Sequence, residues 1–264
     1  MITSNPISDV ADFISPLAMQ LYVIAMLILV VGGTILDTLH KKSAKYFFDN
    51  AEKSKANRKR ALGGGEKVSI ALKTAAVDVL ASGEFCNPRR RLAHLLTMYG
   101  FVIFVVATVI LVFGYPTAET TTPAYLPLLW HLGALMVCAG GYWFWFFIRV
   151  DVAAEGNPWY RIVRADLFIL SLLATTTLAL LWSFLQWADA GGLATLFFWL
   201  FVLASTVLFG SVLWSKFAHM FFKPAAAFQR RVAEADGSRD NLPEPADAPE
   251  RFGLGINREL PRHY

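Results

Sequence analysis

Three of the five histidines in this sequence lie within or at the ends of long apolar stretches. They are His94, His131 and His219, whereas His40 stands beside lysines and His263 is the penultimate residue of a polar terminus. Imidazole binds transition metals and exchanges protons near neutral pH. Polar groups at membrane depth are costly and are usually functional. We therefore take these three as candidates for chemistry and interpret His40 and His263 as solvated surface residues.

The apolar stretches that would position these histidines are as long as membrane spans. Five windows of at least 22 residues contain no Asp, Glu, Lys or Arg: 13–36, 95–118, 120–148, 167–188 and 190–215. About 20 apolar residues in a helix cross a hydrocarbon core of ~30 Å. We therefore predict an all-α integral membrane bundle of five transmembrane helices, at about residues 14–39, 92–115, 124–148, 165–188 and 193–222.

The basic residues predict how such a bundle is oriented. All 24 Lys and Arg residues lie in segments 40–93, 149–164 and 216–264, and the connectors near 115–127 and 188–193 have none. In a chain with five spans, the three basic segments fall on one side. The positive-inside rule then places the N-terminus outside and the C-terminus in the cytoplasm. We expect a multi-pass protein of the cell inner membrane, in contact with lipid. Its net charge of +4 comes from basic residues that border the spans, so we expect no nucleic-acid partner.

Outside the spans, composition divides the chain further. Residues 1–224 form the predicted membrane domain, including a cytoplasmic connector at 40–91 that we expect to be helical. Residues 225–264 are charged and rich in proline and glycine, which predicts a mobile cytoplasmic tail. The pair Gly140–Gly141 in the third span is of the kind that lets helices approach closely, and ordinary packing is its simplest interpretation.

Two of the candidate histidines are expected at the same depth. His94 follows Arg91 by three residues at the inner end of the second span, and His219 lies between two lysines at the inner end of the fifth. If these spans are neighbours, the two imidazoles can bind one iron as the axial ligands of a haem b. The alternative is that both are interfacial residues, hydrogen-bonded to lipid headgroups or loops. His94 and His219 are thus the candidate cofactor and metal ligands.

His131 belongs to the opposite end of the bundle. It stands four residues after Pro127, near the outer end of the third span, and so lies roughly 20 Å in depth from the other two. It cannot share a metal with either. One interpretation is a hydrogen bond to a neighbouring backbone group. The other is a contact with a quinone headgroup, because an imidazole can donate to a quinone carbonyl or accept a proton from a quinol.

Two motifs at the inner ends of the second and fifth spans carry a family resemblance. They are "FCNPRRRLAHLLTMYGF" at 85–101 and "WSKFAHMFFKPAAAFQRR" at 214–231. With the five spans, they resemble the cytochrome b family of the nitrate reductase gamma subunit, in its sulfur-metabolism branch. That branch includes the membrane anchor of adenylylsulfate reductase and a membrane component of the quinone-interacting membrane-bound oxidoreductase. The resemblance covers about residues 75–232 and implies haem b between the second and fifth spans.

The sequence also departs from this family in one respect. The nitrate reductase protein carries a second, outer pair of histidines, and Phe104 and residues such as Phe201 and Leu203 stand where they would be expected. An outer haem is therefore not expected, and the resemblance does not make His131 a ligand.

The resemblance implies a membrane anchor and electron-transfer subunit rather than a catalyst acting on a soluble substrate. Its expected partners are a cytoplasmic iron–sulfur or flavin oxidoreductase, of which adenylylsulfate reductase is the nearest fit, and the quinone pool. Whether the chain itself reacts with quinone stays open. Two alternatives also remain: a purely structural anchor without a cofactor, and the gamma-type cytochrome b subunit of another respiratory reductase.

Overall fold

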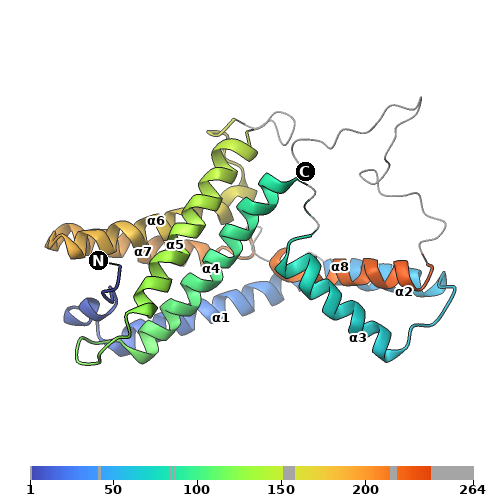
Figure 1. Ribbon diagram of the computed structural model, residues 1–264, viewed down its shortest axis with the longest axis horizontal. Helices are drawn as coiled ribbons and strands as arrows, with labels where there is room; N and C mark the ends of the chain where they lie inside the picture. The colour runs from blue at the N-terminus through green and yellow to red at the C-terminus, as the bar shows by residue number, and fades with distance from the viewer. Residues whose placement is uncertain are drawn as a thin grey trace.

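Five long apolar helices form the main body of the protein (Figure 1). The computed structural model describes residues 2–40, 43–83, 85, 87–150, 158–214 and 219–238, and within these ranges every regular element is helical. The helices long and apolar enough to cross a membrane are α1 (Pro16–His40), α4 (Pro88–Gly114), α5 (Tyr125–Trp143), α6 (Leu167–Trp187) and α7 (Gly191–Gly210). The predicted all-α architecture with five spans is confirmed, and it indicates a multi-pass membrane protein.

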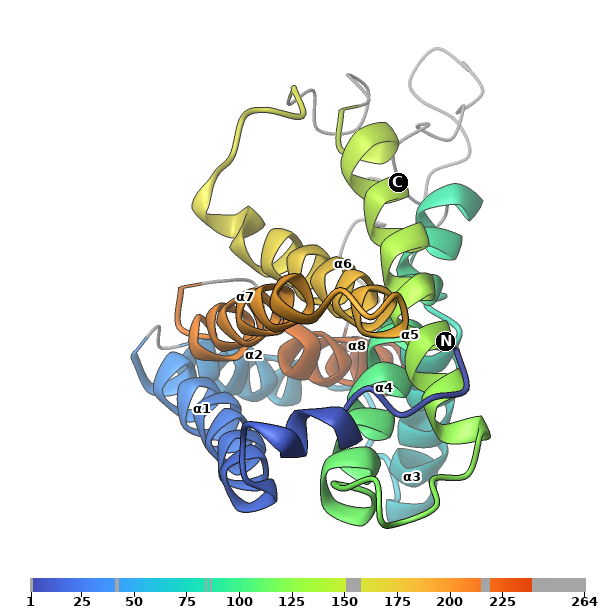
Figure 2. The same ribbon diagram turned by 90° about the vertical axis from the view of Figure 1, so that its left-hand side faces the viewer.

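The spans are arranged as two close pairs and one peripheral helix. Helices α4 and α5 run side by side and cross the direction of α6 and α7, while α1 lies along one flank against α7 and α4 (Figures 1 and 2). Most large side chains of α1 are exposed, among them Leu17, Leu21 and Ile28. Because the bilayer rather than water surrounds such a helix, this apolar face is what a lipid-facing span requires.

Glycines bring α4 and α5 into backbone contact. A Cβ atom at Gly100 would lie 2.7 Å from the carbonyl oxygen of Gly133, and one at Gly140 would lie 2.5 Å from the carbonyl oxygen of Ala93. No side chain fits at such distances, so the helices can pack this closely only at glycine. The close helix approach that Gly140 permits is therefore confirmed in place of ordinary packing, and Gly100 and Gly133 extend the same contact toward the other end of the pair.

The segments without lysine or arginine gather at one end of the bundle, which we call the N-terminal end. Asn5 donates from Nδ2 to the carbonyl oxygen of Tyr115 at 2.8 Å and to Oγ1 of Thr122 at 3.1 Å. Gln186, at the end of α6, donates to the carbonyl oxygen of Pro6 at 3.2 Å. The segment just before the short helix η1 (Ser8–Asp12) therefore closes this end by joining the α4–α5 connector to the end of α6.

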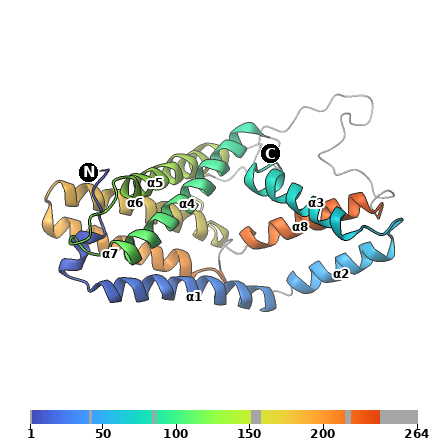
Figure 3. The ribbon, with the colours of Figure 1, turned by 60° about the horizontal axis from the view of Figure 1, so that its bottom comes forward.

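The other end carries a set of helices that projects beyond the spans. It consists of α2 (Ser43–Ala56), α3 (Gly64–Lys73), its π-helical continuation η2 (Thr74–Leu80) and α8 (His219–Ala235), and we call these four elements the stalk. Figures 1 and 3 show the stalk at the opposite end from the N-terminus, with α2 continuing the direction of α1. The connector predicted at residues 40–91 is thus helical at 43–56 and 64–80, whereas residues 57–63 and 81–83 form no helix and residues 88–91 already belong to α4.

Backbone and side-chain bonds hold the stalk together. The carbonyl oxygen of Asp236, just after α8, accepts hydrogen bonds from the backbone N–H groups of Lys59 and Arg60 at 2.9 and 3.2 Å. Arg231 of α8 donates to both carboxylate oxygens of Asp78 in η2, at 2.6 and 2.9 Å. The two side chains are only 18% and 6% exposed. This bidentate pair is the main polar contact between α8 and the α3–η2 segment.

Replacing Asp78 by asparagine is expected to loosen α8. Its hydrogen bonds with Arg231 lower the pKa of the Asp78 carboxyl below its ordinary value, so the pair stabilises the fold at neutral pH and is lost as pH falls through that lowered pKa. Asp78→Asn should cost about 1.5–3 kcal/mol at pH 7, measured by thermal unfolding in detergent. The difference from the wild type should shrink below about pH 4.

Glu234→Gln is the matched control for this variant, because Glu234 makes an exposed pair with Arg230 on the same helix at 3.5 Å. It should change stability by less than about 0.5 kcal/mol. Equal effects of the two variants, or a difference between Asp78→Asn and wild type that persists in acid, would contradict the role given to the buried pair.

The fifth span is shorter than the sequence indicates. It was expected at residues 193–222, but α7 ends at Gly210 and the chain turns at 211–214. His219 begins a separate helix, α8, and Pro224 lies inside that helix rather than ending a span. Pro224 stands in the second turn of α8, and the helix continues through it to Ala235. The π-helical segment η3 (Phe144–Ile148) continues α5, and with it the other four spans begin and end within about one helical turn of the prediction.

The boundary predicted at residue 225 between the membrane domain and a mobile tail also differs from the structure. Residues 225–235 are helical and belong to the stalk, so a mobile tail does not begin at residue 225. The remainder of the expected tail, residues 239–264, lies outside the described residues.

Candidate functional site

His94 lies in the second turn of α4, where the bundle meets the stalk. Its Nδ1 atom is 3.0 Å from the hydroxyl oxygen of Ser82, and its ring packs against Phe85 with the ring centroids 4.8 Å apart. Ser82 is 1% exposed and has a positive φ of 48°. A hydrogen bond to one ring nitrogen fixes the orientation of an imidazole and directs the other nitrogen, as at metal sites where a neighbouring group orients a histidine ligand.

The segment that presents Ser82 is itself bound to the first turns of α4. The carbonyl oxygen of Leu80 accepts from the hydroxyl of Tyr99 at 2.7 Å, and that of Ala81 accepts from Nε of Arg91 at 2.8 Å. The N–H of Gly83 donates to the carbonyl oxygen of Val77 at 2.7 Å. A Cβ atom at Gly83 would lie 2.8 Å from that same carbonyl oxygen, so the turn requires glycine there. These contacts hold Ser82 against His94.

The expected partner of His94 is placed by the structure only in part. The backbone of His219 begins α8, and its side chain lies outside the described residues. Lys223, one turn further along α8, has its Nζ atom 5.7 Å from the centroid of the Phe85 ring, the ring that packs on His94. Phe85 is therefore a neighbour of both His94 and Lys223, and α8 approaches it from the stalk rather than as a continuation of α7. The axial pair stays a prediction.

One observation of this chain tests its fit to a haem. Ser82 orients the His94 imidazole from a buried position, which is the support that an axial ligand needs. In the ranges that the structure describes, no cluster of three or more His, Cys, Asp or Glu side chains is present. A metal site built from protein ligands alone is therefore not indicated there, whereas a haem needs only the two axial groups.

His131 is buried inside the bundle, toward the N-terminal end. Its Nδ1 atom is 2.7 Å from the carbonyl oxygen of Pro127, and its Nε2 atom is 2.8 Å from the hydroxyl of Ser183. The side chain is 1% exposed and meets the ring of Trp130 edge to face. The interpretation as a hydrogen bond to a neighbouring backbone group matches this geometry. A quinone contact at His131 stays a prediction, and it would require one of these two bonds to be exchanged.

Aromatic rings fill the level at which an outer haem would be expected. The centroids of Phe104 in α4 and Phe201 in α7 are 6.5 Å apart, and Trp182 of α6 stacks on Phe201 at 5.5 Å. Trp130 and Phe198 complete the cluster, at 6.1 and 5.0 Å from Trp182. All five side chains are less than 10% exposed. A macrocycle could enter this level only if these packed rings moved apart.

A buried arginine at the stalk end was not identified from the sequence. Arg149 is 1% exposed, pairs with Asp166 and donates to the carbonyl oxygens of Pro158 and Arg161 at 3.3 and 2.6 Å. Its guanidinium carbon lies 4.2 Å from the ring centroid of Trp145. The charge is therefore fully compensated. Its role is to hold the segment before α6 against the end of η3 (Phe144–Ile148).

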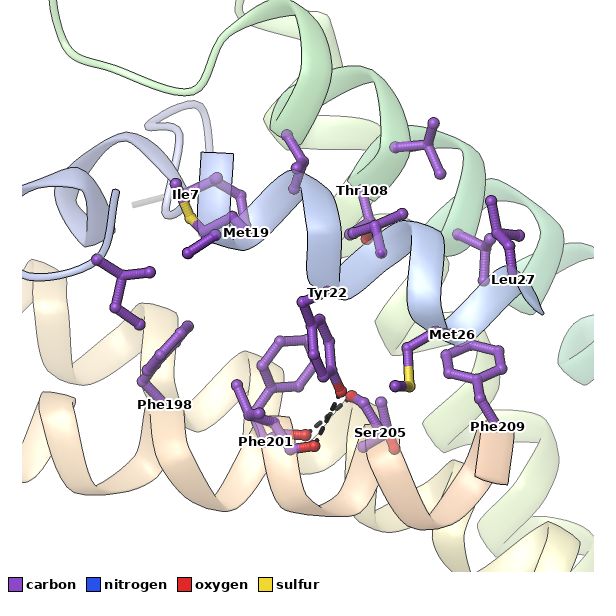
Figure 4. A pocket seen from close by; sticks show the side chains of 18 of the residues that line it. Ile7, Met19, Tyr22, Met26, Leu27, Thr108, Phe198, Phe201, Ser205 and Phe209 are labelled. Atoms are coloured by element: carbon purple, nitrogen blue, oxygen red, sulfur yellow. Dashed lines mark hydrogen bonds between the residues drawn. The ribbon is translucent and has the colours of Figure 1, made fainter. Parts of the chain in front are cut away.

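An apolar cavity between α1, α4 and α7 was also missed. It has a volume of about 280 Å³ and is lined by apolar and aromatic side chains, which Figure 4 shows around Tyr22. Tyr22 crosses from α1 to α7, where its hydroxyl donates to the carbonyl oxygen of Val202 at 3.1 Å or bonds Thr206 at 3.0 Å. The sequence contains no signal for this cavity, because it arises from the way in which a peripheral helix meets two others.

The comparisons with known proteins do not assign a family. No family model, no curated protein and no solved structure matches this chain. The features of this chain that bear on its function are therefore the arrangement of the helices, the stalk and His94.

Proposed function

We propose that this chain is the membrane anchor and electron-transfer subunit of a cytoplasmic oxidoreductase. We further propose that it lies in the cell inner membrane, with its N-terminus outside and its C-terminus in the cytoplasm. Support comes from charge and architecture together: the segments without Lys or Arg gather at the N-terminal end, and the basic segments begin at the stalk end. By the positive-inside rule the stalk then faces the cytoplasm.

The stalk is the proposed docking surface for the soluble partner. It extends away from the spans (Figure 3) and exposes cationic side chains on α2 and α3, among them Lys53, Lys55, Lys67 and Lys73. Val68 and Leu72 are exposed between the α3 lysines, at 59% and 67%. Exposed apolar side chains flanked by lysines suit a partner whose surface is acidic around an apolar centre. By resemblance, that partner is an iron–sulfur and flavin enzyme such as adenylylsulfate reductase.

The proposal of electron transfer is supported by one observation: Ser82 orients the imidazole of His94 at the junction of stalk and bundle. In this proposal His94 and His219 would hold a haem b, and quinone would exchange electrons with the membrane protein. A bound haem b would supply a one-electron carrier at the level where the partner docks. The contribution of this chain beyond the ligands is Ser82, whose hydroxyl fixes the orientation of the His94 ring.

Affinity purification of the full chain in mild detergent tests the docking proposal. We expect an iron–sulfur or flavin oxidoreductase to co-purify, identified by mass spectrometry and by its flavin absorbance. Its identity separates adenylylsulfate reductase from another respiratory reductase. The double variant Lys67→Glu, Lys73→Glu should lower the amount of co-purified partner by about tenfold at low salt, because it replaces attraction by repulsion.

Glu119→Lys is the control, since Glu119 is exposed on the connector at the N-terminal end. Reversing its charge should leave the partner in place. Absence of any co-purifying oxidoreductase, or equal recovery with the α3 double variant, would refute the proposed docking surface.

A further inference from the structure

The cavity between α1, α4 and α7 runs along the flank of the bundle. Ile7 lines it at the N-terminal end, and Leu27 and Phe209 line it toward the stalk end (Figure 4). Ile7 is held there by the bonds of Asn5, which also accepts from the N–H of Ile7 at 3.0 Å. The segment before α1 therefore closes one end of an elongated cavity. An elongated shape fits a chain better than a compact ring system.

The lining has the chemistry of an apolar site without a polar anchor. Of the side chains around it, none is charged, and four carry hydroxyl groups. Thr108, Thr175 and Ser205 each donate to a backbone carbonyl oxygen of their own helix, at 2.7 to 2.8 Å. Tyr22 is bonded to α7. Because these hydroxyls are engaged by the protein, they offer little to a polar headgroup, and the favoured occupant is a hydrocarbon chain.

The cavity is continuous with the lipid-facing surface. Leu27 and Trp199 line it and are each 50% exposed, so its rim reaches the surface that the bilayer covers. An empty apolar cavity forfeits the dispersion contacts of its walls. A chain dissolved in the bilayer can enter from the side without crossing water, whereas a soluble ligand cannot.

Aromatic side chains in the lining favour one kind of hydrocarbon chain as the occupant. Six rings line the cavity: Tyr22, Phe104, Phe198, Trp199, Phe201 and Phe209. Unsaturated isoprene units can place their double bonds against aromatic edges, an interaction that a saturated acyl chain lacks. Met19 and Met26 add flexible, polarizable walls that can adapt to methyl branches. The lining therefore complements an isoprenoid chain in shape, charge and polarizability.

We propose that this cavity binds the isoprenoid tail of a quinone. The inference rests on the proposed function for the presence of a quinone, and it adds the site that retains one beside the bundle. Along α4, Val105 of the cavity is 11 residues from His94, which is about 16 Å at 1.5 Å per residue. The quinone is thus held on the same helix as the oriented imidazole.

Two valines of α4 provide a matched test. Val109 lines the cavity, whereas Val106 is 51% exposed and is not part of its lining. The probe is a ubiquinone with a short isoprenoid tail, titrated into purified protein while quenching of tryptophan fluorescence is followed. Val109→Phe should weaken binding by about tenfold, because the added ring occupies the cavity, and Val106→Phe should change it less than about twofold.

A second pair of variants, on α1, controls for the case in which Val109→Phe fails to fold. Ala18 lines the cavity and Leu17 faces away from it, 63% exposed, so Ala18→Phe should weaken binding and Leu17→Phe should not.

The tail of the quinone provides a further test on the wild type. Decyl-substituted and tailless quinones should bind the wild type about tenfold more weakly than the isoprenoid probe. Equal binding of the three quinones, or unchanged binding in both cavity variants, would overturn the proposal. Displacement of the probe by phospholipid alone would assign the cavity to an acyl chain and also overturn it.

Measurements on the same preparations separate this inference from the proposed function. Co-purification of the partner and the haem spectrum should be unaffected in Val109→Phe. If both are present and the tail does not bind, the cavity proposal alone fails. If the isoprenoid probe binds but neither partner nor haem is found, the cavity remains an isoprenoid site and the proposed function fails.

Discussion

Purified His94→Ala protein is expected to lack the haem b absorbance that we predict for the wild type. Alanine removes the one candidate axial ligand whose orientation the structure shows, fixed by Ser82 at 3.0 Å. The loss should be at least about tenfold in haem per protein, since one remaining axial histidine binds far more weakly. The measurement is the haem content of protein purified in detergent, from its reduced absorbance spectrum.

Ser82→Ala separates orientation from coordination. It keeps the imidazole and removes the hydroxyl that holds it, so haem should be retained while its midpoint potential shifts. His263→Ala, in the terminus, should leave the spectrum unchanged and controls for histidine replacement as such. Full haem content in His94→Ala protein that elutes as a monodisperse peak would show that His94 is not a ligand.

Gly140→Leu is expected to be the most damaging single replacement in the bundle. A Cβ atom there would meet the backbone carbonyl oxygen of Ala93 at 2.5 Å and Oγ1 of Thr97 at 2.6 Å. Backbone atoms cannot move aside, so α4 and α5 must separate. Overpacking of this kind costs about 1–3 kcal/mol and sometimes more, which should lower the thermal unfolding midpoint in detergent. Because Ala93 precedes His94, haem content should fall as well.

Gly32→Leu is the matched control on α1. A Cβ atom at Gly32 has no neighbour within 4 Å, so a leucine there extends into lipid and should leave the unfolding midpoint near that of the wild type. If the two variants unfold together, the close α4–α5 contact does not determine the stability of the bundle.

The spans could be predicted because their signal is local. Apolar length and the absence of charge decide whether a helix can cross a bilayer, and four of the five helices were located to about one turn by these two properties. The end of the fifth could not be located in this way. The sequence after Gly210 stays apolar through Trp214, so hydropathy continues across a point at which the helix stops and the chain turns.

The candidate histidines could be identified from the sequence, but the residues that orient them could not. His94 stood out as an imidazole beside basic residues at the entrance of a span. Ser82 did not, because its contact depends on a turn that Gly83 and the bonds of Leu80 and Ala81 bring onto α4. The displacement of His219 to α8 has the same origin: the stalk is assembled by contacts such as Asp78–Arg231, which join segments far apart in the sequence.

A reduced-minus-oxidised absorbance spectrum of the purified wild-type chain tests the central claim most directly. If His94 helps to hold a haem b at the junction of stalk and bundle, the oxidised protein has a Soret band, and reduction produces a sharp α band. A chain that serves only as a structural anchor has aromatic absorbance alone in both states. That second spectrum, recorded on folded, monodisperse wild-type chain freed of its partner, would contradict the account.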